Sequence, residues 1–171
     1  MHDTVAYSAK NKILYAANRG FTEYHAAQVE LLKLLGAESI EDIISFSLKQ
    51  PIEIIAGRKT VFEYITNSHV AVTELISRSN FPDSIESLST GLGMIFNHLG
   101  RISICKMYAN DYDQYMDEIE NMTVEESYIG DKFSEIKSIM NGFLGKTDIL
   151  SIGQIYLPTI IELTKKIEGN L

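Results

Sequence analysis

The chain has 171 residues and a mass of 19.2 kDa, with 45% hydrophobic and 22% charged residues, values ordinary for one soluble globular domain spanning residues 1–171. Its net charge is −8, and residues 81–171 hold seven Lys and Arg against fourteen Asp and Glu. This composition disfavours nucleic acid as a partner, because no cationic stripe is present to displace counterions from phosphates, and the acidic half would be repelled by an anionic bilayer.

The chain also carries signals about its compartment. No apolar run approaches the roughly 20 residues that a membrane span requires. The first twelve residues lack the apolar segment of a signal peptide. Cys105 is the single cysteine, so no internal disulfide can form. We therefore expect a cytoplasmic protein without a membrane span.

Two helices are predicted at the start of the chain. Apolar residues recur at three- and four-residue steps over 4–19, and this weak pattern stops at Gly20. A stronger helical pattern covers 22–35, where Thr22 can cap the start and Gly36 the end. The sequence therefore predicts two helices separated at Gly20.

The next segment reads as a helix interrupted by a proline. Ser39 followed by Asp42 resembles a capping box, and an apolar face follows it. Pro51 removes a backbone donor and crowds the preceding turn, which predicts a kink or break at 49–51. Beyond the proline one apolar stripe continues for about seven turns. Its members are Ile54, Ile55, Val61, Phe62, Ile65, Val72, Leu75 and Ile76.

A loop at 80–83 precedes a long helical stripe that begins at Ser84 and continues to Ile119. Three glycines interrupt the stripe, each costing about 1 kcal/mol relative to alanine inside a helix. We expect another backbone to pack closely at Gly91 and Gly93, and a bend at Gly100.

The C-terminal third is predicted to be helical as well. Residues 123–127 form a further cap, 141–145 form a loop, and a last helix over 147–168 is kinked at Pro158. Strand signals are poor throughout, and the Asn141-Gly142 pair follows a helical pattern, so a helix end is favoured there over a hairpin. The expected fold is therefore an all-α bundle of about six helices, two of them kinked by proline.

A pattern recurs in the two halves of the chain. The stretch from Asp42 to Pro51 resembles the stretch from Asp148 to Pro158, and each follows a glycine and an apolar helix. A duplication and a chance similarity both explain this pattern. If the duplication is real, units 21–79 and 131–170 each form a helix–cap–helix unit.

No catalytic motif stands out from the background, so we expect a protein that is not an enzyme and needs no cofactor. His98 and Cys105 lie seven residues apart on one helix face, and an ordinary buried pair is favoured over a metal or haem site. Tyr108, Tyr112 and Tyr115 follow each other at helical spacing. Core packing is favoured for them, and an adaptable groove for a partner or apolar ligand is the alternative.

One stretch of the chain resembles the phasins, the helical proteins that coat polyhydroxyalkanoate granules in bacteria. The resemblance rests on Gly36-Ala-Glu-Ser39, Asp42-x-Ile44, Gln50-Pro51 and the amphipathic run to 62–65, Phe-Glu-Tyr-Ile. It covers about residues 22–78, with a fainter second copy near 132–168. The chain departs from the family in being rich in Ile, Tyr and Ser rather than Ala, Gln and Lys, and in lacking a low-complexity tail.

The phasin resemblance implies binding to an apolar polymer or lipid surface, or to a protein partner, by a homo-oligomer. Ile54, Ile55, Val61, Phe62 and Ile65 are the surface-binding candidates, because an apolar helical stripe can lie on such a surface. The same stripe can equally form the core of a bundle. The alternative function is a compact helical ligand-binding or sensor domain with an apolar, haem-like pocket.

Overall fold

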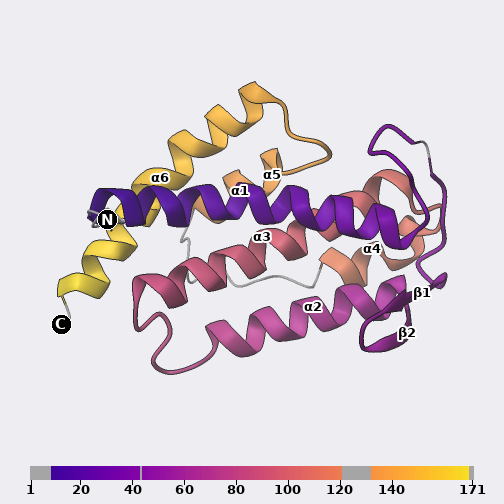
Figure 1. Ribbon diagram of the computed structural model, residues 1–171, viewed down its shortest axis with the longest axis horizontal. Helices are drawn as coiled ribbons and strands as arrows, with labels where there is room; N and C mark the ends of the chain where they lie inside the picture. The colour runs from indigo at the N-terminus through magenta and orange to yellow at the C-terminus, as the bar shows by residue number, and fades with distance from the viewer. Residues whose placement is uncertain (1–8, 43, 121–131, 170–171) are drawn as a thin grey trace, which may run out of the picture.

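The computed structural model describes residues 9–42, 44–120 and 132–169. Within this part the chain forms six helices and one small hairpin, so the predicted all-α class is confirmed in the main (Figure 1). The elements are α1 (Ala9–Leu34), β1 (Pro51–Ile54), β2 (Gly57–Thr60), α2 (Val61–Ile76), α3 (Ile85–Tyr108), α4 (Tyr112–Glu120), α5 (Lys132–Ile139) and α6 (Lys146–Gly169).

The long helices α1 and α3 lie side by side and make the most extensive contact between elements (Figure 1). The predicted break at Gly20 is wrong, because α1 continues through it. Gly20 faces α3, where an added Cβ would lie 3.1 Å from the Phe96 ring. The glycine therefore reflects close packing against an aromatic side chain rather than a helix end.

Close packing also explains Gly100, where a bend was predicted. The helix α3 is continuous through this position. A Cβ on Gly100 would overlap the carbonyl oxygen of Tyr24 in α1, so the two backbones meet here. Gly91 and Gly93 are closely packed as well, but against side chains rather than the predicted backbone: Phe81 lies against Gly91, and an added Cβ on Gly93 would be 3.0 Å from Nε of Arg19.

The end of α1 follows the prediction at Gly36. Gly36 has a φ of +89°, and the Ala37 amide donates to the Leu32 carbonyl at 3.0 Å. The Gly36 amide donates to the Lys33 carbonyl at 3.0 Å, which completes a Schellman motif.

The helix predicted from Ser39 is absent from residues 39–42 and 44–50, which the structure describes as irregular apart from a bridge at Phe46. The Asp42 carboxylate accepts hydrogen bonds from the amides of Glu38 (2.7 Å) and Ser39 (2.9 Å), so it closes a local turn instead of capping a helix. Further on, Phe46 pairs with Ala109 in an isolated parallel bridge, which ties this segment to the end of α3. Long-range backbone bonds thus replace helical ones.

Pro51 begins a β-strand, so the predicted helix kink there is wrong. Strands β1 and β2 form an antiparallel hairpin in which Pro51 pairs with Thr60 and Ile54 with Gly57. Gly57 has a φ of +106°, a conformation that its missing Cβ permits and that short hairpin loops often require. Proline is compatible with the first position of a strand. This hairpin was therefore not predicted, because the strand signals in the sequence are poor.

The helix α2 starts after the hairpin and is shorter than the seven-turn stripe predicted from Ile54. Thr60 caps it in a capping box: the Glu63 amide donates to the Thr60 hydroxyl at 3.2 Å, and the Thr60 amide donates to the Glu63 carboxylate at 2.7 Å. These hydrogen bonds lower the pKa of Glu63. The helix spans 16 residues and leaves Ile54 and Ile55 outside it.

The long stripe predicted from Ser84 divides into two helices. Ser84 caps α3, as expected from the start of the stripe, and the Ser87 amide donates to the Ser84 hydroxyl at 3.1 Å. The helix ends at Tyr108, Ala109 is extended, and α4 begins at Tyr112. The three tyrosines that were expected at helical spacing therefore lie on two separate helices and do not form one row.

The C-terminal elements agree with the prediction in outline. The loop over 141–145 is present, Gly142 has a φ of +73°, and Pro158 lies inside α6. The cap predicted at 123–127 lies outside the described residues. The described residues from Asp42 to Pro51 are irregular and end in a strand, whereas the stretch from Asp148 to Pro158 is helical. The proposed repeat units therefore do not share one local structure.

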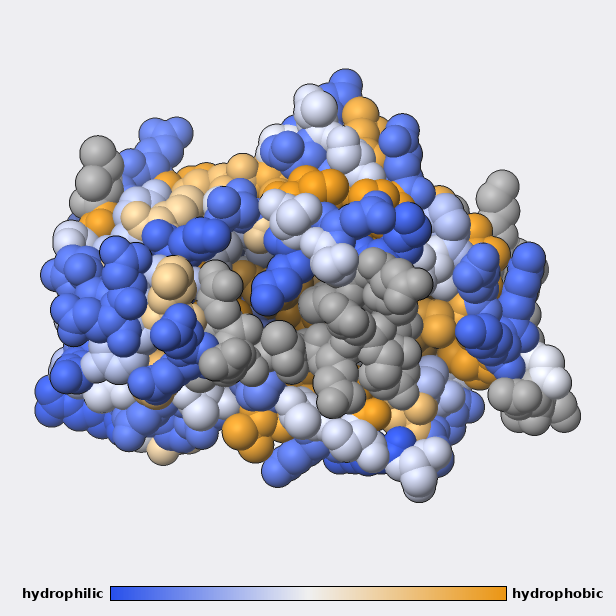
Figure 2. All heavy atoms as spheres, turned by 180° about the vertical axis from the view of Figure 1, so that it is seen from behind, coloured by the Kyte–Doolittle hydropathy of each residue, from blue (hydrophilic) through white to orange (hydrophobic). Residues whose placement is uncertain are grey.

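The buried side chains form two apolar clusters. One contains Tyr24, Phe96 and Tyr156 and joins α1, α2, α3, α5 and α6. The other contains Leu31, Phe46 and Ile65 and lies toward the hairpin. On the face seen in Figure 2, hydrophobic side chains reach the surface in separate patches between hydrophilic ones. Among the described helices, none has the length and apolar content needed to cross a membrane.

Candidate ligand pocket

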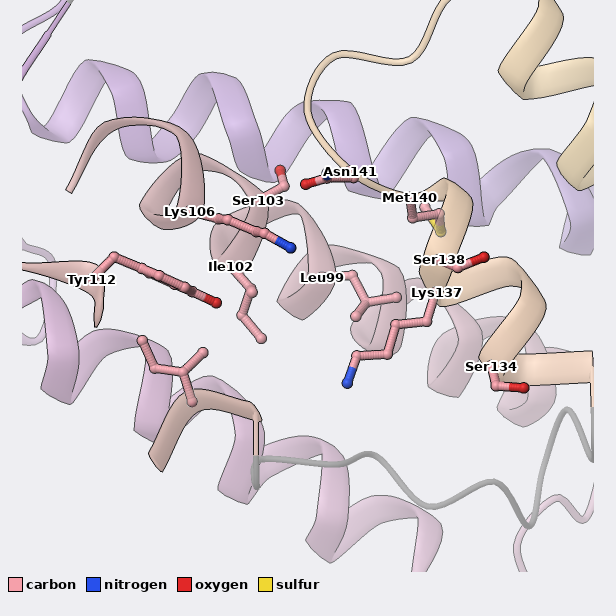
Figure 3. Close-up of a pocket in the computed structure, with 11 residues that line it drawn as sticks. Leu99, Ile102, Ser103, Lys106, Tyr112, Ser134, Lys137, Ser138, Met140 and Asn141 are labelled. Atoms are coloured by element: carbon pink, nitrogen blue, oxygen red, sulfur yellow. The ribbon is translucent and has the colours of Figure 1, made fainter. Parts of the chain in front are cut away.

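A pocket of about 300 Å³ lies where α3, α4 and α5 meet (Figure 3). Each helix contributes residues at helical spacing, because positions three, four and seven apart share a face. Its lining comprises Leu99, Ile102, Ser103 and Lys106 of α3, Tyr112 and Ile119 of α4, Ser134, Lys137 and Ser138 of α5, and the following Met140 and Asn141. The pocket is thus built from three helix faces.

The floor of the pocket is apolar and the rim is polar. Leu99, Tyr112, Ile119 and Met140 are buried, with at most 7% of their surface exposed. The polar side chains exposed at the rim include Lys106 of α3 and Ser134, Lys137 and Ser138 of α5. Ser103 of α3 is buried. Figure 3 shows Lys106 and Lys137 extending from opposite sides toward Ile102 and Leu99. A molecule in the pocket would contact an apolar floor beneath two cations.

A buried hydrogen-bond network behind the pocket fixes part of its wall. Gln28 of α1 donates through Nε2 to the Ser103 hydroxyl and to the Gly142 carbonyl, both at 2.8 Å. The Tyr24 hydroxyl donates to the same carbonyl at 2.8 Å, and Ser103 donates to the Gly100 carbonyl at 2.8 Å. Burial raises the pKa of Tyr24 to about 12, so this hydroxyl stays protonated as a donor. The network holds the turn after Met140 against α1.

The junction between α3 and α4 is held by Asp111. The Ser47 hydroxyl donates to its Oδ2 at 2.5 Å, and the Leu48 amide donates to its Oδ1 at 2.8 Å. Burial by itself tends to raise the pKa of Asp111, but these hydrogen bonds outweigh burial and lower it. The carboxylate thereby fixes where α4 leaves α3, and α4 carries the Tyr112 wall of the pocket.

The residues predicted to bind an apolar surface do not form one exposed stripe. Val61 and Ile65 are completely buried in the cluster toward the hairpin, and Phe62 and Ile54 are half-buried against it. Ile55 alone of the five is exposed, at the tip of the hairpin. Of the two readings of the stripe that the sequence leaves open, the structure supports the bundle core.

The three candidate tyrosines take different roles. Tyr112 is buried and lines the pocket. The ring of Tyr115 lies 5.0 Å from that of Phe62, and Nζ of Lys49 is 5.8 Å from its centroid. Tyr108 is half-buried at the end of α3. The structure therefore places one of the three at the pocket.

His98 and Cys105 are completely buried on α3 and do not line the pocket. The rings of His98 and His69 lie 5.6 Å apart between α3 and α2. Burial raises the pKa of the Cys105 thiol, which disfavours the reactive thiolate. Within the described part of the chain, no group of His, Cys, Asp and Glu is arranged to hold a metal ion.

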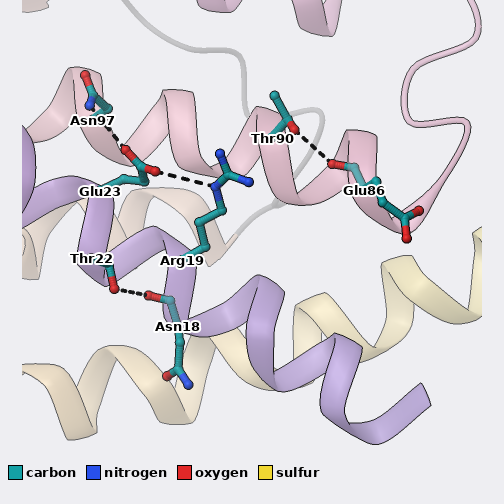
Figure 4. A network of polar contacts seen from close by, with 7 residues as sticks. All are labelled: Asn18, Arg19, Thr22, Glu23, Glu86, Thr90 and Asn97. Atoms are coloured by element: carbon teal, nitrogen blue, oxygen red, sulfur yellow. Dashed lines mark hydrogen bonds and ion pairs between the residues drawn. The ribbon is translucent and has the colours of Figure 1, made fainter. Parts of the chain in front are cut away.

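A second cleft of about 240 Å³ lies between α1, α2 and α3 and contains two arginines. Arg19 pairs with Glu23 at 3.5 Å, and Asn97 also donates to Glu23 (Figure 4). Arg101 pairs with Glu30 at 2.9 Å and lies over the Tyr64 ring at 4.5 Å. Both cations of this cleft are thus matched by carboxylates of the protein.

Comparisons with protein-family models, with curated proteins and with solved structures gave no significant match to this chain.

Sequence reasoning missed most of the pocket residues. Ser134, Lys137 and Ser138 share one face of a short helix, and Leu99, Ile102 and Lys106 share one face of α3. The sequence did contain one indication of the pocket. Residues 81–171 hold only seven Lys and Arg, and two of them, Lys106 and Lys137, lie on helix faces whose other residues are apolar or small. Nothing in the sequence indicated that these two faces meet.

Proposed function

We propose that this protein is a helical ligand-binding domain and that the pocket between α3, α4 and α5 binds a small apolar molecule. The observation that carries the proposal is the buried apolar floor of Leu99, Tyr112, Ile119 and Met140 beneath an accessible polar rim. Small-molecule sites commonly combine an apolar lining with a few polar groups, and about 300 Å³ is at the lower end of their volume range.

The experiment is a fluorescence titration with N-phenyl-1-naphthylamine, a neutral molecule whose emission rises in apolar surroundings. We expect a saturable increase with one equivalent bound, because the pocket admits one small apolar molecule. Ile102→Trp should weaken this binding at least tenfold by filling the pocket. Ile149→Trp, the same change at an exposed position of α6 outside the pocket, should bind as the unchanged protein does.

A second variant tests the pocket independently, because Ile102→Trp could weaken binding by disturbing the fold. Ser138 is exposed at the rim, so Ser138→Phe can obstruct the entrance without entering the core. Its helical circular dichroism should be unchanged while probe binding weakens. Absence of saturable binding by the unchanged protein, or equal binding by the variants at positions 102, 138 and 149, would contradict the proposed function.

The phasin-like function stays a prediction, and it would require a change in the structure of the folded protein. Because Val61 and Ile65 are buried, α2 would have to separate from its neighbours before the stripe could coat a surface. In the folded protein only Ile55 of that set is fully accessible. Partition onto oil droplets tests this alternative, and strong coating that Phe62→Glu abolishes would favour it over the pocket.

A further inference from the structure

The pocket carries two cations without carboxylate partners in the described part of the chain. Lys106 comes from α3 and Lys137 from α5, and both extend toward the space above the apolar floor (Figure 3). Neither participates in the ion pairs found among the described residues, which join Arg19 to Glu23, Arg58 to Glu53, Arg101 to Glu30 and Lys132 to Glu135. Among the described residues that line this pocket, both charged side chains are therefore cations, in a protein of net charge −8.

The cations of the second cleft, between α1, α2 and α3, differ from those of the pocket in having carboxylate partners. There, Arg19 and Arg101 are neutralised by Glu23 and Glu30, so an entering anion would have to compete with carboxylates already in place. At the pocket rim an anion meets Lys106 and Lys137 without displacing a paired carboxylate of the described residues. Electrostatic complementarity of this kind commonly selects which ligand a site accepts.

From these contacts we infer that the ligand is an anionic amphiphile, a single apolar chain or ring system carrying one acidic head group that lies between Lys106 and Lys137. This inference rests on the proposed function. The apolar body would cover Leu99, Ile102 and Met140, and the head would remain at the wet rim beside the serines of α5. The volume of about 300 Å³ suits a medium-length single chain rather than a two-chain lipid.

The lysines set the charge of the head group but not its exact geometry. A lysine ammonium is a compact point charge with three rotatable donors, whereas an arginine fork selects planar, bidentate partners. Carboxylate, sulfate and phosphate heads are therefore all compatible with the site. A free small molecule is favoured over a membrane lipid, because the acidic half of the chain would be repelled by an anionic bilayer.

Competition against N-phenyl-1-naphthylamine tests the inference with chain-matched ligands. Decanoate, decyl sulfate and decyl phosphate share an apolar chain length with neutral 1-decanol. We expect each anion to bind roughly three- to tenfold more tightly than the alcohol, since two exposed ion pairs each contribute modestly. This advantage should shrink as salt concentration rises, because exposed charges are screened. A preference for one anion identifies the head group.

The variant Lys106→Met/Lys137→Met removes both charges and keeps the apolar stems. It should bind decanoate and decanol equally. Saturable binding of the neutral probe, measured alongside, reports whether the pocket is still formed in this variant. The control variant Lys146→Met/Lys165→Met makes the same change at two exposed lysines of α6 outside the pocket, and it should keep the preference for anions.

The outcomes separate the inference from the proposed function. If the neutral probe binds but decanoate and decanol compete equally, or if the rim variant keeps the anion preference, the inference is overturned and the pocket stands. If the neutral probe does not bind at all, both are overturned. Loss of probe binding only in the rim variant would mean that the lysines maintain the pocket's shape, which also overturns the inference.

Discussion

At the scale of single residues, Asp111 shows how one side chain can connect distant parts of the chain. It accepts hydrogen bonds from Ser47 and Leu48, which precede the hairpin, and it lies just before α4. A charged acceptor of this kind is stronger than a neutral one. The carboxylate thus links an irregular segment to the helix that carries Tyr112.

We expect Asp111→Asn to lower the free energy of unfolding by about 1–2 kcal/mol, because an amide cannot replace the charged acceptor at both donors. Urea denaturation followed by circular dichroism measures this change. The control is Asp117→Asn, a change at an exposed position on α4, which should alter stability by less than about 0.5 kcal/mol. Equal effects of the two substitutions would show that Asp111 is not a structural link.

The lowered pKa of Asp111 predicts that the stability of the protein depends on pH. The pKa of Asp111 is lower in the folded state than its ordinary value, so its contribution to stability is complete above the unfolded-state pKa. That contribution is lost as pH falls through the folded pKa, in the acid range below about 4. The stability difference between the unchanged protein and Asp111→Asn should therefore narrow in that range. A difference that stays constant down to the folded pKa would contradict this account.

At the scale of elements, the contact between α1 and α3 depends on glycine. The α3 backbone approaches α1 at Gly100, where the Tyr24 carbonyl occupies the place of a Cβ. The residues of the buried network lie on either side of this contact: Gln28 lies one turn beyond Tyr24 on α1, and Ser103 lies three residues beyond Gly100 on α3. The spacing between the two helices therefore also sets one wall of the pocket.

Gly100→Ala should destabilise the protein by about 1–3 kcal/mol, since the added methyl group forces the two helix backbones apart. The control is Gly153→Ala in α6, where no neighbouring atom lies within 4 Å of an added Cβ. That substitution should stabilise the protein by roughly 0.5–1 kcal/mol through helix propensity. Thermal unfolding measures both changes, and a neutral Gly100→Ala would argue against the close helix contact.

Helical periodicity predicted most of the helices, but the glycines and prolines did not show by themselves whether a helix ends or continues at their positions. Gly36 ends a helix as expected, whereas Gly20 and Gly100 lie inside helices, because the neighbouring side chain or backbone that they accommodate comes from a distant part of the sequence. Pro51 is compatible with either a helix break or a strand start. The choice depends on pairing with β2, which a local pattern does not reveal.

The site was less predictable than the fold for a related reason. Tyr112, one of the ligand-binding candidates, lines the pocket, but it was expected beside Tyr108 and Tyr115 on one helix. The turn before α4 depends on the Phe46 bridge to Ala109 and on Asp111, and both involve residues more than sixty positions earlier. Periodicity within one helix contains no information about such contacts.

At the scale of the whole molecule, α1 and α3 form a long axis with the hairpin at one end and the C-terminal part of α6 toward the other (Figure 1). The apolar clusters lie along this axis, and α4 and α5 approach α3 from either side of the pocket. A helical framework that carries a pocket with an apolar floor and two lysines at its rim is suited to binding a small molecule.

In the proposed function, the ligand binds in the pocket between α3, α4 and α5. The most direct test is a two-dimensional amide NMR titration of the isotope-labelled protein with decanoate. We expect saturable shifts at the amides of Ile102, Lys106, Tyr112 and Met140, with those of Ile55 and Arg58 at the hairpin unchanged. Shifts confined to the hairpin or to the cleft between α1, α2 and α3, or no saturable shifts at all, would contradict binding at this pocket.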